Sequence, residues 1–219
     1  MNKNYFILLL LSALCMQAGA QTSNDYASAK KEKKQKGRQL GIRGGYNIPR
    51  MAGEKNMDLK PGTKNGYTFS LSYSPASRSG MGFRSELVYS SQNFSFSADG
   101  QKTAIKQEYI YLPQFTTIGI SKFFQLQVGG QIGFLLNANR SSGGKSKESL
   151  LSAMNRLDYG AAGGLEVYPF KGIIIGGRYN MNFGKTYKAP TGTFNPLPFN
   201  PSDVKGSNAV INFYLGYKF

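Results

Sequence analysis

The closing stretch Asn208–Phe219 reads NAVINFYLGYKF, and its pattern decides the fold. An apolar side chain occupies every second position from Ala209 to Phe219. The polar residues Asn208, Asn212 and Lys218 occupy positions between them, on the opposite face. Successive side chains of a β-strand point to opposite faces, so this alternation predicts a strand with one apolar and one polar face.

Seven upstream segments show the same two-residue period. No convincing amphipathic helix follows residue 38, although Ser149–Met154 could form one or two turns inside a loop. One of the segments is ambiguous, because both of its faces are mixed and Pro113 either removes a ladder bond or marks a bulge. We therefore predict about eight strands, at residues 39–48, 66–74, 80–91, 108–120, 124–138, 156–168, 172–184 and 208–219.

The predicted connections alternate between short and long. Short turns are expected at 75–79, 121–123 and 169–171, and long loops at 49–65, 92–107, 139–155 and 185–207. Short turns at one end and long loops at the other are typical of outer-membrane barrels, with both chain termini on the short-turn, periplasmic side. A soluble β-sandwich has no reason to sort its loops in this way.

The strand lengths favour a membrane location. Most predicted strands have nine residues or more, and about 9–11 tilted residues cross a hydrocarbon core. Backbone groups in lipid must all be paired, so the sheet must close on itself. Outward aromatic residues near strand ends would form an interfacial girdle, and the final Phe219 resembles the terminal-strand signal of proteins inserted into the outer membrane. We predict an all-β fold, a closed antiparallel transmembrane β-barrel with meander topology.

The N-terminus carries a different kind of signal. Phe6–Met16 is an apolar run of eleven residues that follows Lys3 and precedes the small-residue site Ala18–Ala20. The run is too short for a transmembrane helix and is typical of a cleaved signal peptide. We expect residues 1–20 to be this signal, 21–38 to be a flexible, Lys-rich periplasmic tether, and 39–219 to be the barrel.

Composition excludes several functions. The chain has no histidine, and its one cysteine, Cys15, lies in the predicted signal. A histidine-dependent catalytic pair and a thiolate or histidine metal site are therefore absent, and we expect no enzyme activity, no cofactor and no metal. The formal net charge is +16. An exported protein seldom meets nucleic acid, so we expect anionic lipid, including lipopolysaccharide, to be the counter-charge.

The strands also carry loose motifs, which are Tyr109-Ile-Tyr-Leu-Pro113, Val128-Gly-Gly-Gln-Ile-Gly133, Asp158-Tyr-Gly160 with Gly163-Gly164, Arg178-Tyr179, and the strand ending at Phe219. Through them the segment Gln39–Phe219 resembles the PorT-like outer-membrane β-barrel family. The resemblance implies an eight-stranded barrel, mostly without an assigned activity. The family's namesake is tied to a secretion apparatus, and nothing in these residues carries that role to this chain.

The polar faces predict a charge network inside the barrel. Both signs are present on these faces, and buried charges are costly unless they are paired. An eight-stranded barrel has an interior only wide enough for its own side chains, so we expect a filled lumen rather than a wide pore. The candidate lumen residues are Arg43, Arg84, Glu86, Arg156, Asp158, Glu166 and Arg178.

Any specific function is then expected in the loops. The last long loop sets two phenylalanines among prolines, which favour an extended, semi-rigid contact surface, and two other loops are net positive. The candidate contacts are Phe194, Phe199, Lys55, Lys60, Lys145 and Lys147. We expect a monomer with a structural or loop-mediated binding role toward outer-membrane lipids or another envelope protein. Two alternatives remain open, a narrow porin-like channel for small solutes and a soluble, secreted ligand-binding barrel.

Overall fold

The computed structural model describes residues 39–52, 60–75, 80–98, 101–142, 148–184, 186–188 and 207–219. The predicted signal and tether lie outside these residues. The elements are β1 (Gln39–Ala52), β2 (Lys60–Ser74), β3 (Met81–Ala98), β4 (Gln101–Gly119), β5 (Phe124–Ser142), β6 (Glu148–Ser149), the 3-10 turn η1 (Leu151–Ala153), β7 (Leu157–Val167), β8 (Ile173–Asn182) and β9 (Ser207–Lys218). In the described part of the chain, no helix is long and apolar enough to span a membrane.

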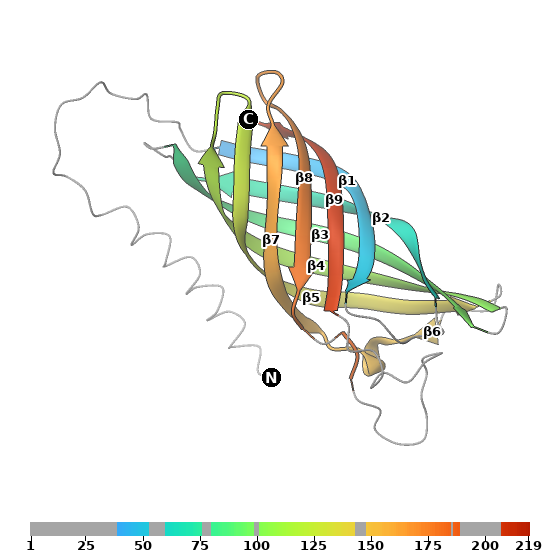
Figure 1. Cartoon of the computed structure of the whole chain (residues 1–219). Coiled ribbons are helices and arrows are strands. Elements are labelled where there is room, and N and C mark those ends of the chain that lie inside the picture. The colour runs from blue at the N-terminus through green and yellow to red at the C-terminus, as the bar shows by residue number, and fades with distance from the viewer. Residues whose placement is uncertain are drawn as a thin grey trace, which may run out of the picture. The chain divides into compact units, whose positions relative to one another are not determined.

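The eight long strands close into an antiparallel barrel with meander topology (Figure 1). Each long strand pairs with its neighbours in the chain, and β9 pairs with β1 to close the sheet. The register is staggered. Following paired residues once around the barrel from Leu40 leads to Arg50, ten residues further along β1. This stagger is the strand tilt that a closed barrel requires. The predicted fold class is confirmed.

The barrel is apolar outside and polar inside. Leu215 is 63% exposed and Phe69 60% exposed, whereas Arg84 and Glu86 are each only 3% exposed. A soluble ligand-binding barrel would carry the reverse arrangement, so the exterior identifies a barrel solvated by lipid. Aromatic residues expected at the interface do face outward, with Tyr46 at 67% and Phe183 at 53% exposure.

The long loop predicted at 92–107 is wrong. β3 continues to Ala98 and β4 begins at Gln101, so most of this segment is paired strand. Likewise β1 continues to Ala52, β2 begins at Lys60, and β5 continues to Ser142. The pairing of β1 with β2 ends at Asn47–Gly66. Pro49 lies just beyond that point, where β1 has β9 alone as a partner, and this position tolerates the missing N–H.

These additions make β3, β4 and β5 much longer than the other strands, and their ribbons project beyond the ends of β7 and β8 in Figure 1. We call this part the outer extension, residues 91–98, 101–108 and 135–142. Its described outward side chains include the polar Asn93, Ser95 and Lys106, and the apolar Leu136, which is 42% exposed, lies at its base. The apolar band therefore ends at the base of the extension, where the Lys106 ammonium lies 5.9 Å from the ring centroid of Tyr67 and 2.7 Å from Glu108 Oε1.

The inner face of the outer extension buries apolar side chains together with polar ones such as Gln92 and Gln107. It carries an outer core that includes Phe94, Ile105 and Leu135, each at most 2% exposed. The connection between β5 and β7 covers this core with Leu150 and Met154, both 0% exposed. The predicted short helix at Ser149–Met154 is a single 3-10 turn, η1. It is held in place by backbone hydrogen bonds from Leu150 to Ala138 and from Lys188 to Ala153, and by a β-bridge between Met154 and Tyr187.

The ambiguous face of strand four is explained by this outer core. The inward side chains of β4 are Thr103, Ile105, Gln107, Tyr109, Tyr111, Pro113, Phe115 and Thr117. Polar and apolar side chains are mixed along this inward face, where Gln107 is buried beside Ile105, while the outward face changes from Ile118 and Ile110 to the charged Glu108 and Lys106. Pro113 removes ladder bonds rather than forming a bulge, because pairing between β3 and β4 is interrupted between Ser85–Gln114 and Val88–Tyr111.

The first prediction tests the apolar band. Val128 is 56% exposed and lies near the middle of the part of β5 that pairs with β7. Val128→Arg should lower the free energy of unfolding from lipid vesicles by about 2–4 kcal/mol, because a cation is then placed in hydrocarbon. Ser95→Arg in the outer extension is the matched control and should leave it nearly unchanged. Similar losses for both variants would contradict the assigned membrane boundary.

Candidate functional site

Five charged side chains meet inside the barrel and form what we call the lumen cluster. Arg43 comes from β1, Arg84 and Glu86 from β3, Glu166 from β7 and Arg178 from β8. All five are at most 7% exposed. They lie in the half of the lumen nearer the short turns, since Arg84 is the fourth residue of β3 and Glu166 is the last but one of β7.

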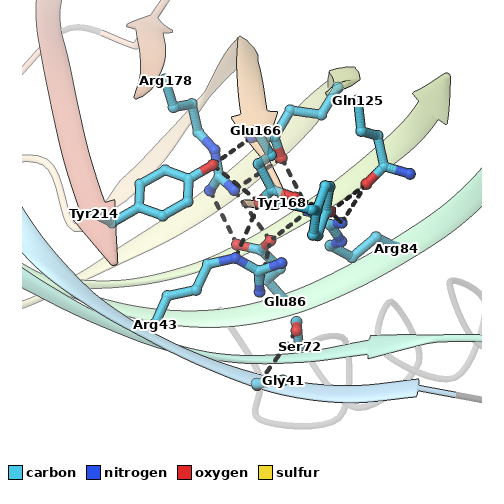
Figure 2. Close-up of polar contacts among 11 residues, drawn as sticks. Gly41, Arg43, Ser72, Arg84, Glu86, Gln125, Glu166, Tyr168, Arg178 and Tyr214 are labelled. Carbon is cyan, nitrogen blue, oxygen red and sulfur yellow. Dashed lines mark hydrogen bonds and ion pairs between the residues drawn. The ribbon is translucent and has the colours of Figure 1, made fainter. Parts of the chain in front are cut away.

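Glu86 lies between the guanidinium groups of the cluster (Figure 2). Arg178 binds it in a bidentate manner, with Nη1 to Oε2 and Nη2 to Oε1 both at 3.0 Å. Arg43 Nη1 and Arg84 Nη1 lie 3.5 and 3.8 Å from Glu86 Oε1. Paired N–H donors aligned with both carboxylate oxygens form the strongest type of protein ion pair. Glu86 therefore joins three strands across the lumen.

Glu166 is the second acid of the cluster. Its Oε1 accepts hydrogen bonds from Arg84 Nη1 at 2.8 Å, from Arg43 Nε at 3.1 Å and from the Tyr214 hydroxyl at 3.1 Å. The Tyr168 hydroxyl donates to its Oε2 at 2.5 Å. Both carboxylate oxygens thus accept hydrogen bonds, as a fully buried anion requires.

Neutral groups complete the cluster. Gln127 Oε1 accepts from Arg178 Nη2 at 3.0 Å, and Gln127 Nε2 donates to the Tyr214 hydroxyl at 2.5 Å. The Arg178 guanidinium carbon lies 4.3 Å from the ring centroid of Phe115, close enough for a cation–π contact. Through these contacts the cluster connects β1, β3, β5, β7, β8 and β9 across the lumen.

Asp158 faces the lumen but belongs to a separate polar group. Its Oδ2 accepts hydrogen bonds from the Tyr111 hydroxyl at 3.1 Å and from Asn182 Nδ2 at 2.6 Å. Its Oδ1 accepts from the Tyr159 backbone N–H at 2.9 Å. Asp158 is 7% exposed, and these donors are all neutral. The group lies between the lumen cluster and the outer core, because Asp158 is the second residue of β7 whereas Glu166 lies near its other end.

Arg156 does not enter the lumen, contrary to the sequence prediction. It precedes β7, its side chain is exposed, and its carbonyl accepts the backbone N–H of Leu135. The strand begins at Leu157, one residue later than predicted, so the alternation that would have turned Arg156 inward does not reach it.

Two glycines allow large aromatic side chains to occupy the narrow lumen. A Cβ at Gly133 would lie 2.2 Å from Cε1 of Tyr111, and a Cβ at Gly176 would lie 2.3 Å from the ring of Tyr214. Any side chain at either position would displace a tyrosine that bonds a buried acid. Sequence reasoning did not identify Tyr111 or Tyr214 as site residues. Tyr214 lies on the same alternating face as Asn212 and Lys218, so its inward direction could have been predicted. Tyr111 lies on the strand whose two faces are mixed, where no such signal exists.

A small cavity of about 30 Å³ separates the lumen cluster from the Asp158 group. Its wall includes Arg43, Arg178, Gln131, Asn182 and Tyr111. A cavity needs roughly 10–15 Å³ to hold one water-sized molecule, so this space admits no more than a few.

The predicted loop contacts lie largely outside the described residues. This applies to Lys55, Lys145, Lys147, Phe194 and Phe199. Lys60 is the first residue of β2, and its side chain is likewise outside the description. Among the described residues, no group of three or more acidic, cysteine or histidine side chains could hold a metal ion.

Comparison with known proteins gives one family match. The model of the family described as "Outer membrane protein beta-barrel domain" matches residues 20–188. No curated protein matches the sequence.

Several solved structures are similar in outline. Ail, the attachment invasion locus protein of Yersinia pestis, in complex with the heparin analogue sucrose octasulfate, has 18% identity and a TM-score of 0.47, covering 84% of this chain and 100% of that chain. Neisserial surface protein A has 11% identity and a TM-score of 0.47, covering 85% and 100%. OprG from Pseudomonas aeruginosa has 16% identity and a TM-score of 0.40, covering 84% and 97%. Identities and TM-scores this low transfer no function to this chain.

The second prediction concerns the lumen cluster. Glu86→Gln removes the anion that Arg43 and Arg178 share and leaves buried positive charge without compensation. The free energy of unfolding should fall by about 3–5 kcal/mol. Glu148→Gln is the matched control, because Glu148 pairs with Arg140 in a partly exposed contact, and such pairs contribute only about 0–1 kcal/mol. Equilibrium urea unfolding of both variants from lipid vesicles measures the difference. Equal losses would show that the cluster is not what holds the lumen together.

Proposed function

The chain belongs to the outer membrane protein beta-barrel domain family, and from this premise we propose that it is a closed, non-conducting barrel that binds envelope components through its outer end. The observation that carries the proposal is the filled lumen. The charged side chains of the lumen cluster are buried near the short turns, and the outer core with Leu150 and Met154 is buried at the opposite end. In this proposal the barrel wall has a structural role, and partners are bound by the surfaces that lie outside the membrane.

The proposed role involves no catalysis. The sequence has no histidine, and the buried acids that the structure describes are engaged by arginine, tyrosine or asparagine donors rather than directed at an open cleft. A carboxylate held in this way cannot exchange protons with a substrate without breaking its ion pairs.

We place the outer extension and the long loops outside the cell, with the short turns and both termini in the periplasm. The outward polar faces of β3, β4 and β5 continue well past the apolar band, as outward-facing loops of outer-membrane barrels do. Export through the signal at residues 1–20 and a periplasmic tether at 21–38 complete this topology. The mature chain would then contain no cysteine, because Cys15 would be removed.

The partners proposed are outer-membrane lipids, including lipopolysaccharide, and another envelope protein. Exposed cations lie near the outer end of the barrel, namely Arg50 at the end of β1, Arg156 before β7 and Lys188. Their height above the apolar band suits contact with lipid phosphate groups. Phe194 and Phe199, set between prolines in the last long loop, are the proposed contacts with a protein.

Within the family, we propose the PorT-like branch. Two of its motifs support each other in this chain, since Tyr111 of the aromatic–proline strand pairs with Gly133 of the glycine-rich strand and its ring occupies the space that a side chain there would need.

The third prediction tests the closed lumen. The purified protein in planar lipid bilayers should give no stable unitary conductance, because charged pairs and an apolar core fill the passage. A known wide porin in the same bilayers is the positive control. Reproducible single-channel steps from this protein would favour the alternative function, a narrow channel for small solutes.

The fourth prediction tests orientation and binding together. Asn93 lies in the outer extension, and Lys171 lies in the short turn between β7 and β8. Asn93→Cys and Lys171→Cys each introduce a lone thiol into the mature chain. A membrane-impermeant, thiol-reactive photocrosslinker should label intact cells at position 93 only and form an adduct there with lipopolysaccharide or an envelope protein.

Labelling at position 171 in intact cells would reverse the proposed topology. Labelling at position 93 without any adduct would argue against binding by the outer extension and leave a purely structural role.

A further inference from the structure

The wall of the lumen cavity contains positively charged side chains and no negatively charged ones. Arg43 and Arg178 both line it, whereas none of the acids of the lumen lines it. The rest of the wall consists of neutral groups such as Ser70, Gln131 and Asn182. Glu86 and Glu166 bind the guanidinium groups without lining the cavity, and Asp158 is hydrogen-bonded to Tyr111 and Asn182, which do line it. A water-sized space next to two cations, with no anion in its wall, has a positive potential.

Both of these arginines have unused hydrogen-bonding capacity. Arg43 is 6% exposed and Arg178 is 7% exposed. Arg43 Nη1 and Arg178 Nε make no hydrogen bond to any described group, although Arg43 Nη1 lies 3.5 Å from Glu86 Oε1. Buried N–H groups of a cation are costly when they are unpaired. Arg84 Nε is unpaired as well, but Arg84 does not line the cavity. An acceptor in the cavity would lie next to the two arginines that do.

The cluster also has an imbalance of charge. It holds three arginines and two glutamates in mutual contact, so it carries one positive charge in excess. Asp158 could balance this charge only from the other side of the cavity. A volume of about 30 Å³ suits one halide ion or one or two water molecules.

We propose that the lumen cavity binds one small inorganic anion of halide size, which acts as an internal counter-ion for Arg43 and Arg178. Chloride is the abundant ion of this class. The anion completes the charge balance of the cluster and stabilises the folded barrel by mass action, because the unfolded chain offers no such site. The site lies inside the lumen and is separate from the outer surfaces proposed for partner binding.

The direct test is a crystal of the whole protein grown or soaked in bromide. Bromide scatters anomalously, so its position can be told from water. An anomalous peak in the cavity, within hydrogen-bonding distance of Arg43 or Arg178, is the expected result. Density without an anomalous signal would mean that only water occupies the cavity, and that outcome would overturn the proposal.

A solution experiment tests the consequence for stability. Thermal unfolding of the native protein is compared in sodium chloride and sodium gluconate at the same ionic strength, because gluconate is too large for the cavity. The unfolding midpoint should rise by equal steps for each tenfold increase in chloride above the dissociation constant, and stay constant in gluconate. Identical midpoints in the two salts would contradict the site.

A matched pair of variants separates charge from filling of space. Ser70 lines the cavity and is the cross-strand partner of Arg43. Ser70→Asp supplies a permanent carboxylate at the proposed anion position, and Ser70→Asn fills the same space without charge. The Asp variant should lose both bromide binding and the dependence on chloride, and should be more stable in gluconate than the native protein. The Asn variant should show no such gain. Equal behaviour of the two variants would contradict an electrostatic site.

Discussion

The structure depends on burying charge in a space too narrow for water to solvate it. Lipid outside the wall takes the apolar side chains, so every polar side chain of the alternating pattern must turn into the lumen. There, arginines and glutamates must satisfy one another, because an unpaired charge in that position would cost more than the barrel gains by closing. Glu86 shows the result most clearly, with its carboxylate in bidentate contact with Arg178 on a distant strand. The same contacts that remove the cost also lock the register of four strands.

The outer extension lies beyond the apolar band, where the surrounding solvent is water instead of lipid. In the outer extension Phe94, Ile105 and Leu135 are buried inside, and the polar Asn93, Ser95 and Lys106 lie on the outward face, so these side chains are arranged as in a soluble protein. One strand, β4, passes through both environments with a single inward face, from Phe115 and Tyr111 within the membrane to Ile105 beyond it. In the role that we propose, recognition takes place at surfaces at the ends of the barrel, away from the lumen cluster and the outer core.

Prediction from sequence was strongest where one physical cause dominates the pattern. The last strand, the strands that include Leu126 and Ile175, and the short turns follow from simple alternation, because one side of each strand faces lipid and the other the lumen. It was weakest where the environment changes along a strand. The segment 92–107 is rich in polar residues and therefore has the composition of a loop. Its strand character depends on the burial of Phe94 and Ile105, which only the tertiary structure shows.

The sequence by itself determined the alternating strands and the residue types on their two faces, because alternation and composition are local properties of the chain. It favoured a membrane barrel and left a soluble barrel open, and the structure decided between them by placing the apolar faces outside. The sequence did not determine which charges meet. Arg43, Arg84, Glu86, Glu166 and Arg178 come together only because the stagger of a closed sheet brings four separate strands to the same level, whereas Arg156 falls one residue outside its strand. Pairing across a lumen depends on the register of the whole barrel, and register is a property of closure rather than of any single strand.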